Sequence, residues 1–590
     1  MTLRVANCSG FYGDRLSAAK EMVEGGPIDV LTGDWLAELT MLILAGNRLK
    51  GRPGYAPTFL RQLEDVLGPC LDRGIKIVSN AGGLDPAGCA EAVHELAAKL
   101  GLSPAIAHVT GDDLTGRDLD LVNADTGERF AGTPLTANAY LGGRPIAAAL
   151  SAGADVVVTG RVTDAALVTG PGIWRYGWGP GDLDPLAGSV VAGHIIECGC
   201  QATGGNYAFF QDVPDLAHCG FPIAELRADG SAVITKHPGT GGLVSVGTVT
   251  AQLVYELGSP CYLGPDVVAR FDTITLSQEG PDRVLVSGVR GEPPPDTLKV
   301  AVNYLGGYRN TMTLVLTGLD IEAKARAAQA AIWARIPRES FDEVDVSLSE
   351  SGLLRITVMD ADQRLAGRAF SSAVVETGLA SYPGFYGLTP PGNASPFGVY
   401  WPVLIPATEV RPQVFLNGRE LPLDTTTPPH SPAPSRREAD RRSQASQTAG
   451  DGHQVPAVGG QGAGGAGRVR VPLGWIAGAR SGDKGGNANL GVWTDTPDRY
   501  RWLVTHLTTE TLKTLLPALA PHRVERHELP NLKAINFVIH GLLGRGVAAS
   551  PRMDPQAKAL GEELRAQPVD VPSPLAPPAT PAAPPPAARP

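Results

Sequence analysis

Short apolar runs alternate with longer helical patterns over about the first 234 residues. Strand-like runs occur at LRVANCSG near the start and then at residues 29–32, 75–80, 105–109 and 155–159. Helical patterns lie between these runs, over residues 15–24, 57–73 and 86–100. This rhythm predicts an α/β fold with a mainly parallel sheet covered by helices. In such sheets ligands bind beyond the carboxyl ends of the strands, so the polar residues there are the candidates for a site.

The pattern changes after about residue 235. Strands of antiparallel type surround one amphipathic helix, Ile321–Arg335, which predicts an α+β part over 235–423. Residues 424–468 hold few core-forming side chains and predict a flexible linker. Periodic structure returns over 469–565 and predicts a ferredoxin-like α+β module, in which two strands flank a polar loop. The Pro/Ala-rich tail, 566–590, is predicted to be disordered.

Composition narrows the class of protein. The 590 residues are 43% hydrophobic and 19% charged, as in a folded globular protein. The formal net charge of −10 argues against a nucleic-acid partner. The seven cysteines include no C-x-x-C pair and the N-terminus lacks an apolar signal core, so we expect a cytoplasmic location. The longest apolar run, Leu39–Gly46, is too short to span a bilayer, so we expect no membrane partner.

Charged residues follow two of the predicted strands. Asp34 and Glu38, in GDWLAE, share a face if this segment is helical, and they suit acid/base chemistry or a divalent cation. Alternatively, Asp34 is a helix N-cap and Glu38 is solvated. Arg161 offers a planar fork for a carboxylate or phosphate, and Asp164 can orient it or act as a base. The alternative is a structural pair in which Asp164 caps the next helix.

Two asparagines occupy equivalent positions after other strands. Asn7 lies in NCSGFYGDR and Asn80 in SNAGG. Because the ends of parallel strands meet at one edge, we expect both to converge with Asp34 and Arg161 on one rim.

The glycine-rich segment His237–Gly247 precedes a predicted helix. Small residues at a helix start expose backbone N–H groups, which predicts an anion site. Its predicted ligand-binding residues are His237, Gly239, Thr240, Gly241 and Gly242. The segment matches neither the Walker A nor the G-x-G-x-x-G pattern, and a tight turn with close helix packing is the alternative. A second glycine-rich stretch, QATGGN, predicts Thr203 and Asn206 as pocket residues.

A cluster of potential metal ligands occurs in HIIECGC, which contains His194, Glu197, Cys198 and Cys200. The C-x-C spacing does not match a zinc site, so no metal site is predicted. A cysteine nucleophile is a weaker alternative to a small buried thiol.

The C-terminal module opens with GARSGDKGGNANLG. Arg480, Asp483 and Lys484 supply charge, and Asn487 and Asn489 supply orienting amides. We expect this loop to fold back over the rim, with Asp483 and Lys484 as catalytic residues. The alternatives are a docking surface and a solvated hairpin connection.

Several long motifs, taken in order, resemble the acyclic terpene utilisation (AtuA-like) family. They are NCSGFYGDR, GDWLAE, SNAGGLDP, VTGRVTDAALV, CGCQATGGNY and HPGTGGLVSVGTVTAQL. The stretch GARSGDKGGNANLGV resembles the ferredoxin-fold module that accompanies that family. The resemblance covers roughly residues 1–423 and 469–545, and it carries over no catalytic residue.

The resemblance implies breakdown of acyclic terpenes and related branched acyl chains through coenzyme A thioesters. We therefore expect an enzyme whose catalytic residues are Asp34, Arg161, Asp164, Asp483 and Lys484, with hydratase, lyase and hydrolase chemistry all open. No cofactor motif is found, and coenzyme A is expected only as part of the substrate. The alternative is a non-catalytic protein that binds or assembles acyl-CoA enzymes, and homo-oligomers are compatible with both. A nucleotide-hydrolysing or phosphate-transfer enzyme is a weaker third option.

Overall fold

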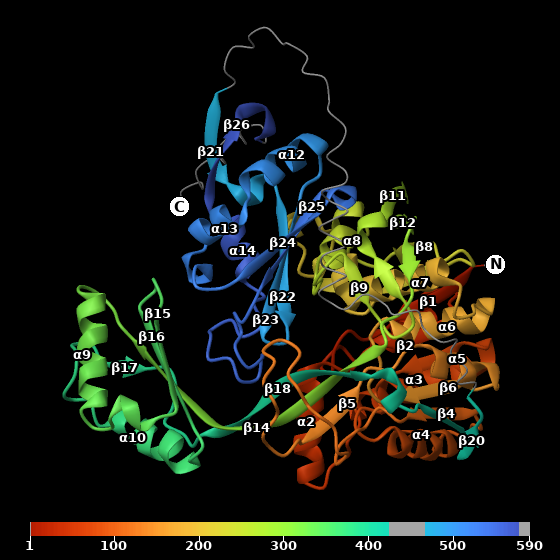
Figure 1. Ribbon diagram of the computed structural model, residues 1–590, viewed down its shortest axis with the longest axis horizontal. Coiled ribbons are helices and arrows are strands. Elements are labelled where there is room, and N and C mark those ends of the chain that lie inside the picture. The colour runs from red at the N-terminus through yellow and green to blue at the C-terminus, as the bar shows by residue number, and fades with distance from the viewer. Residues whose placement is uncertain (1, 424–466, 577–590) are drawn as a thin grey trace, which may run out of the picture.

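The computed structural model describes residues 2–423 and 467–576. Figure 1 shows an α/β body, an arm that projects from it, and a C-terminal module that stands against the body. The predicted linker, except for residues 467 and 468, lies outside the described residues, as do residues 577–590 of the predicted tail.

The body is built on a mixed sheet. Its central strands are parallel, in the order β1 (Leu3–Asn7), β2 (Val30–Gly33), β3 (Lys76–Ser79), β6 (Val156–Thr159) and β4 (Ile106–Thr110). Antiparallel strands extend the β1 edge, in the order β7 (Pro222–Leu226), β8 (Ala232–Lys236), β12 (Arg283–Ser287) and β11 (Thr275–Gly280). At the β4 edge are the antiparallel strands β19 (Gln413–Leu416) and β20 (Arg419–Leu421). The expectation of a mainly parallel sheet is therefore wrong, because only the centre is parallel.

Connection length explains the difference. The central strands are joined by helical crossovers, which return the chain to the same end of the sheet and make neighbours parallel. β7 and β8 are instead joined by a tight turn at Asp229-Gly230, where Gly230 has a φ of 81°. A short D-G turn makes a hairpin, and hairpin strands are antiparallel.

Helices cover both faces of the central strands. One face holds α1 (Ala18–Glu24), α3 (Pro57–Arg73) and α4 (Pro86–Lys99). The other holds α5 (Arg144–Ser151), α6 (Ala166–Tyr176) and α7 (Leu183–Ile196), and α8 (Val246–Leu253) packs beside α7. Successive strand residues point to opposite faces, so Val157 joins one core while Val156 and Val158 join the other.

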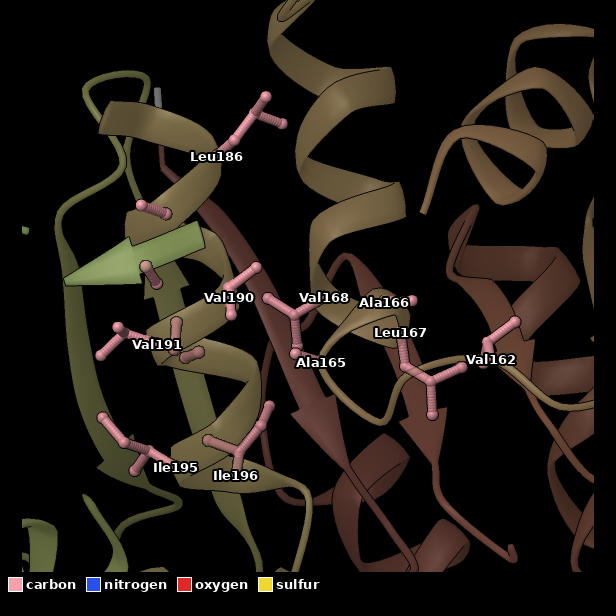
Figure 2. Packing of buried hydrophobic residues seen from close by; sticks show 14 of the residues in the cluster. Val162, Ala165, Ala166, Leu167, Val168, Leu186, Val190, Val191, Ile195 and Ile196 are labelled. Carbon is pink, nitrogen blue, oxygen red and sulfur yellow. The ribbon is translucent and has the colours of Figure 1, made fainter. Parts of the chain in front are cut away.

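The contact between α6 and α7 sets the position of two acidic residues. Figure 2 shows Val168 of α6 and Val190 of α7 directed toward one another within this buried cluster. At the lower end of the contact, a Cβ added to Gly193 would lie 2.7 Å from the Ala165 Cα. Only glycine permits this approach, which brings Asp164, just before α6, close to Glu197, just after α7.

The arm grows out of the body on one long strand. β14 (Thr297–Val315) pairs with β5 (Thr136–Ala139) in the body, with β18 (Ser395–Pro406) along most of its length, and with β16 in the arm. The arm contains β15 (Glu343–Leu348), β16 (Leu353–Asp360), β17 (Tyr386–Gly387), α9 (Ile321–Trp333) and α10 (Phe370–Val375). The observed α9 lies within the predicted helix 321–335. A small separate sheet of β9 (Cys261–Leu263), β10 (Val268–Arg270) and β13 (Arg290–Glu292) packs on α7.

The C-terminal module is ferredoxin-like. Its antiparallel sheet has the order β22 (Gly478–Lys484), β23 (Asn487–Trp493), β25 (Ala534–Ile539) and β24 (Val524–Leu529). The helices are α12 (Pro497–His506), α13 (Thr509–Leu515) and α14 (Leu560–Arg565). β23 and β24 are joined through α12 and α13 and separated by β25, which is a split β-α-β arrangement.

Two expectations for this module are corrected. The predicted loop 478–491 is a β-hairpin made of β22 and β23, with its turn at Gly485-Gly486. The expected disorder from residue 566 does not hold at its start, because β26 (Pro568–Pro572) pairs with β21 (Arg468–Pro472).

The described helices include none that combines the length and the apolar composition needed to cross a bilayer.

Candidate functional site

The carboxyl ends of the parallel strands share one polar rim. The Asn80 Nδ2 donates to Asp34 Oδ1 at 2.6 Å, and the Trp35 N–H donates to Asn80 Oδ1 at 2.8 Å. Asn7 donates to the carbonyl of Glu197 at 3.3 Å. These asparagines position the loops that follow the strands.

Arg161 lies at the centre of this rim and is 3% exposed. Its Nη1 lies 3.1 Å from Asp164 Oδ1 and donates to the Leu36 carbonyl at 2.9 Å. The guanidinium lies over the Tyr140 ring, 4.3 Å from its centroid. The predicted Arg–Asp pair is thus present, but the N-cap of α6 is Ala165, so Asp164 does not cap that helix.

Three acidic residues converge beside Arg161. One carboxylate oxygen from each of Asp34, Asp164 and Glu197 lies within 4.8 Å of the other two. Burial raises the pKa of Asp34, and the Asp164 carboxylate raises it further. Burial also raises the pKa of Glu197, and Asp164 and Glu256 add to the effect. In this arrangement Asp34 and Glu197 are held toward the neutral acid form.

Glu38 behaves differently. It is the first residue of α2 (Glu38–Leu49), whose N-cap is Ala37 and not Asp34. The Tyr140 hydroxyl donates to Glu38 Oε1 at 2.8 Å, and Lys299 Nζ lies 3.5 Å from the same oxygen. Although burial opposes it, Lys299 together with Arg161 holds the pKa of Glu38 at about 2. Glu38 is therefore an ionised group in a charge network, and neither the solvated position nor the pairing with Asp34 is found.

The hairpin of the module docks beside this rim, where Lys484 acts on the charge of Glu197. Lys484 Nζ donates to the Glu256 carbonyl at 2.8 Å and lies 5.7 Å from the centroid of the Tyr262 ring. Asp483 is 4.0 Å from Lys558 Nζ, and burial and the Glu256 carboxylate raise the pKa of Asp483 to about 7.

A cavity lies where the module meets the body. It is lined by Glu38, Leu39, Leu42, Tyr400, Asp483, Gly485, Gly546, Val547 and Ala548. An ionised acid of the body, Glu38, and an acid of the module, Asp483, therefore line one space.

Arg480 docks the hairpin onto the glycine-rich stretch that follows α7. It donates to the Asn206 carbonyl at 2.8 Å and to Gln201 Oε1, and its guanidinium lies 4.8 Å from the Tyr255 ring centroid. Asn206 is exposed and contributes its backbone carbonyl, not its side chain. Thr203 is buried, and its hydroxyl donates to the Gly220 carbonyl at 2.6 Å. Neither side chain is therefore used as the sequence predicts.

Asn489 joins the module to the body instead of facing a ligand. Its Oδ1 accepts from the Glu256 N–H at 2.8 Å and its Nδ2 donates to the Val254 carbonyl at 3.0 Å. Glu256 has a φ of 53°, a left-handed conformation that is uncommon outside glycine and is held here by these contacts. Asn487 accepts from the Gly541 N–H at 2.9 Å, within the module.

Two glycines of the hairpin allow the close docking. A Cβ on Gly482 would lie 2.4 Å from the Tyr255 ring, and one on Gly491 would lie 2.3 Å from Val254. The glycine content of GARSGDKGGNANLG thus reflects an interface as well as a turn.

The segment His237–Gly247 does not present its amides to a ligand. The N–H groups of Gly241, Gly242 and Leu243 donate to the carbonyls of His218, Pro214 and Thr203. His237 is buried, with Nε2 2.9 Å from the Met22 carbonyl. Gly239 and Gly242 adopt positive φ angles, and the Thr240 hydroxyl donates to the His237 carbonyl at 2.8 Å. These contacts favour the tight turn over the anion site.

Cys198 gives no support to nucleophilic chemistry, whereas the side-chain hydrogen bond with Cys200 lowers the pKa of the buried Cys219 to about 6. All seven cysteines are free thiols, and Cys198, the one next to Glu197, has its pKa raised well above the usual range by burial and by Glu197. A thiol held neutral is a poor nucleophile.

Several residues of the site lie outside any recognisable sequence motif. Five separate stretches of sequence supply Tyr140, Glu256, Lys299, Tyr400 and Lys558. The one usable signal is Lys299, a single cation in the apolar strand TLKVAVNYL. A charge inside an apolar run requires a partner, which here is Glu38.

Comparison with known proteins agrees with this architecture. A family model described as "Acyclic terpene utilisation family protein AtuA" matches residues 3–416, and one described as "AtuA ferredoxin-like domain" matches residues 471–570. Neither the curated proteins nor the solved structures include a match. Because the first model covers more than half of the chain, the protein belongs to the acyclic terpene utilisation (AtuA) family.

Proposed function

We propose that this protein is an enzyme of acyclic terpene utilisation that acts on a terpenoid or branched acyl-CoA thioester, or on the acid derived from it. The observation that carries the proposal is the buried rim where Asp34, Asp164 and Glu197 lie beside Arg161 and adjoin the hairpin that bears Asp483 and Lys484. An acid cluster beside cations at a strand-end rim, with the pKa values of Asp34 and Glu197 raised, is typical of catalytic sites.

The acids differ in protonation state. Asp34 and Glu197 are held toward the neutral form, while Glu38 is held ionised by Lys299 and Arg161. Groups whose environments push their pKa values apart can divide the roles of general acid and general base. We assign orientation of a substrate carbonyl or carboxylate to Arg161.

Apolar side chains of α2 adjoin the cavity, and we assign them to contact an apolar acyl chain. Leu39 and Leu42 line the cavity, and Ile43 on the same helix is an exposed apolar side chain. A hydratase, a lyase and a thioester hydrolase would each use such an acid and a polarised carbonyl. Coenzyme A would enter only as part of the substrate.

Turnover by the full-length protein tests the proposal. We would incubate it with geranyl-, citronellyl- and hydroxyacyl-CoA thioesters and follow the gain of water, chain cleavage and release of coenzyme A by mass spectrometry. Arg161→Ala and Asp164→Asn should each lower kcat/KM by roughly 100-fold or more, because the first removes the cation that orients the substrate and the second removes the carboxylate paired with that cation. Arg117→Ala removes an exposed arginine paired with Glu409 and should retain activity. Binding without conversion, unchanged in Arg161→Ala and Asp164→Asn, would overturn the enzyme assignment.

A second candidate function is binding or assembly of acyl-CoA enzymes. The arm exposes the apolar side chains of Leu379, Tyr386 and Leu388, of which Leu379 is fully exposed. Exposed apolar groups gathered on one projecting element are typical of protein-binding surfaces. Under this function, the same thioesters would bind without being converted.

A further inference from the structure

The three carboxylates of the rim come from distant parts of the chain. Asp34 follows β2, Asp164 precedes α6, and Glu197 follows α7. Each offers one oxygen, and the three oxygens lie within 4.8 Å of one another. In octahedral coordination of Mg²⁺ the ligand oxygens lie about 3 to 4 Å from one another. Ca²⁺ accepts ligand oxygens that lie somewhat farther apart. A small inward movement of these side chains would bring them to that geometry.

Two buried polar atoms in and beside the cluster have no hydrogen-bond partner among the described residues. Glu197 is 6% exposed, and its Oε2 accepts no hydrogen bond from the described residues. His194 is 1% exposed, and its Nδ1 lies without a hydrogen-bond partner 3.6 Å from Glu197 Oε1. Leaving such atoms unsatisfied costs about 1 to 3 kcal/mol each, so natural proteins rarely retain them without a ligand or water.

Neighbouring groups fix the orientation of two of the carboxylates. The Asn80 Nδ2 and the Leu36 N–H both donate to Asp34 Oδ1, which orients that carboxylate. Arg161 binds Asp164 through Oδ1. Carboxylates fixed by such outer contacts are typical of metal-binding sites.

We propose that Asp34, Asp164 and Glu197 bind a hard divalent cation of the Mg²⁺/Mn²⁺ class. An all-oxygen ligand set selects hard cations over zinc. Three protein ligands leave further coordination positions for water or a substrate oxygen. This site differs from the divalent-cation alternative that pairs Asp34 with Glu38, because Glu38 binds Lys299 and Tyr140. The sequence predicts no metal site because the C-x-C spacing of Cys198 and Cys200 does not match a zinc site. The three carboxylates proposed here are a different set of ligands, and they lie far apart in the chain.

Direct titration with Mn²⁺ tests this inference without any substrate, so its outcome is separate from that of the proposed function. The full-length protein would be stripped with EDTA and titrated while electron paramagnetic resonance follows free Mn²⁺. We expect one saturable site per chain from which Mg²⁺ displaces the probe. Glu197→Gln and Asp164→Asn should each weaken binding by about tenfold or more, since each removes a ligand. Glu38→Gln, which removes a nearby carboxylate outside the cluster, should change the affinity by less than about threefold.

Two ligand variants are used so that the test still gives a result if one of them does not fold. Asp164 has a side chain that is 24% exposed, so Asp164→Asn should fold even if Glu197→Gln does not. Circular dichroism and gel filtration would verify folding of each variant. Absence of saturable Mn²⁺ binding to the native protein would overturn the inference. Equal affinity in native protein and folded Asp164→Asn would also overturn it, as would a larger loss of Mn²⁺ affinity in Glu38→Gln than in Glu197→Gln.

Discussion

Burial and partner choice set the charge of each acid around the rim. Glu38 is ionised because Lys299 lies against it, whereas Asp34 and Glu197 are shifted toward the neutral form by burial and by other acids. Asp112 shows the effect of burial most simply. Its Oδ2 accepts from the Arg161 N–H at 2.9 Å and from Asn138 Nδ2 at 2.8 Å, and burial raises its pKa to about 6 despite these bonds.

The raised pKa of Asp112 predicts a pH-dependent stability. An unfolded aspartate has a pKa near 3.9, so between about pH 4 and pH 6 the folded protein binds the proton more tightly and loses stability as the pH rises. The shift of about two units corresponds to about 3 kcal/mol. The Asp112→Asn variant has no group that titrates at this position. Its free energy of unfolding, relative to that of the native protein, should therefore be highest at about pH 7 and lower by up to about 3 kcal/mol at about pH 4. Thermal unfolding of both proteins across this range measures it, and a constant difference between them would contradict the prediction.

At the scale of elements, close contacts position the acids. α6 and α7 meet where Gly193 touches Ala165, and this contact brings Asp164 beside Glu197. The apolar pattern indicates strands and helices such as Pro57–Arg73 correctly, because periodicity is a local property. It does not show which helix faces meet, so neither the Gly193 contact nor the pairing of Asp164 with Glu197 follows from it.

Gly193→Ala should disturb this contact. The added Cβ would lie 2.7 Å from the Ala165 Cα, which is backbone and cannot move aside as a side chain would. We expect destabilisation of about 1–3 kcal/mol and reduced Mn²⁺ affinity, because overpacking forces the helices apart. Gly46→Ala in α2 is a matched control, since a Cβ there meets nothing within 4 Å and alanine favours helix. Equal unfolding midpoints for the two variants would rule out the proposed role of the contact.

At the scale of the whole molecule, the ferredoxin-like module packs on residues 254–258 of the body. Asn489 and Asn536 both donate to backbone carbonyls of residues 254–258, and Lys484 donates to the Glu256 carbonyl. The expectation that the hairpin folds back over the rim agrees with this placement, while its catalytic role stays a prediction. Because residues of both the module and the body line the cavity, a change in how the module docks should change the shape of the cavity.

Asn489→Ala should loosen that docking. It removes several buried hydrogen bonds and leaves the Glu256 N–H and Val254 carbonyl without this partner, at a cost of about 1–3 kcal/mol. Hydrogen exchange of peptides covering residues 254–258 should become faster. Asn487→Ala, which removes a bond inside the module, should leave exchange of that segment near its native rate. Unchanged exchange in Asn489→Ala would show that the module docks through other contacts.

The sequence by itself determined the succession of strands and helices, the family, and the strand-end position of Asp34, Asn80 and Arg161. These features depend on local periodicity and on the geometry of parallel strands. Only the tertiary structure decided that the sheet is antiparallel at its edges, that Asp34 meets Asp164 and Glu197, and that Asn489 serves docking. Such pairings join residues far apart in the chain, and the packing of whole elements selects them. The glycines of GARSGDKGGNANLG illustrate the difference, because their number is visible in the sequence while the surface that requires them belongs to another part of the fold.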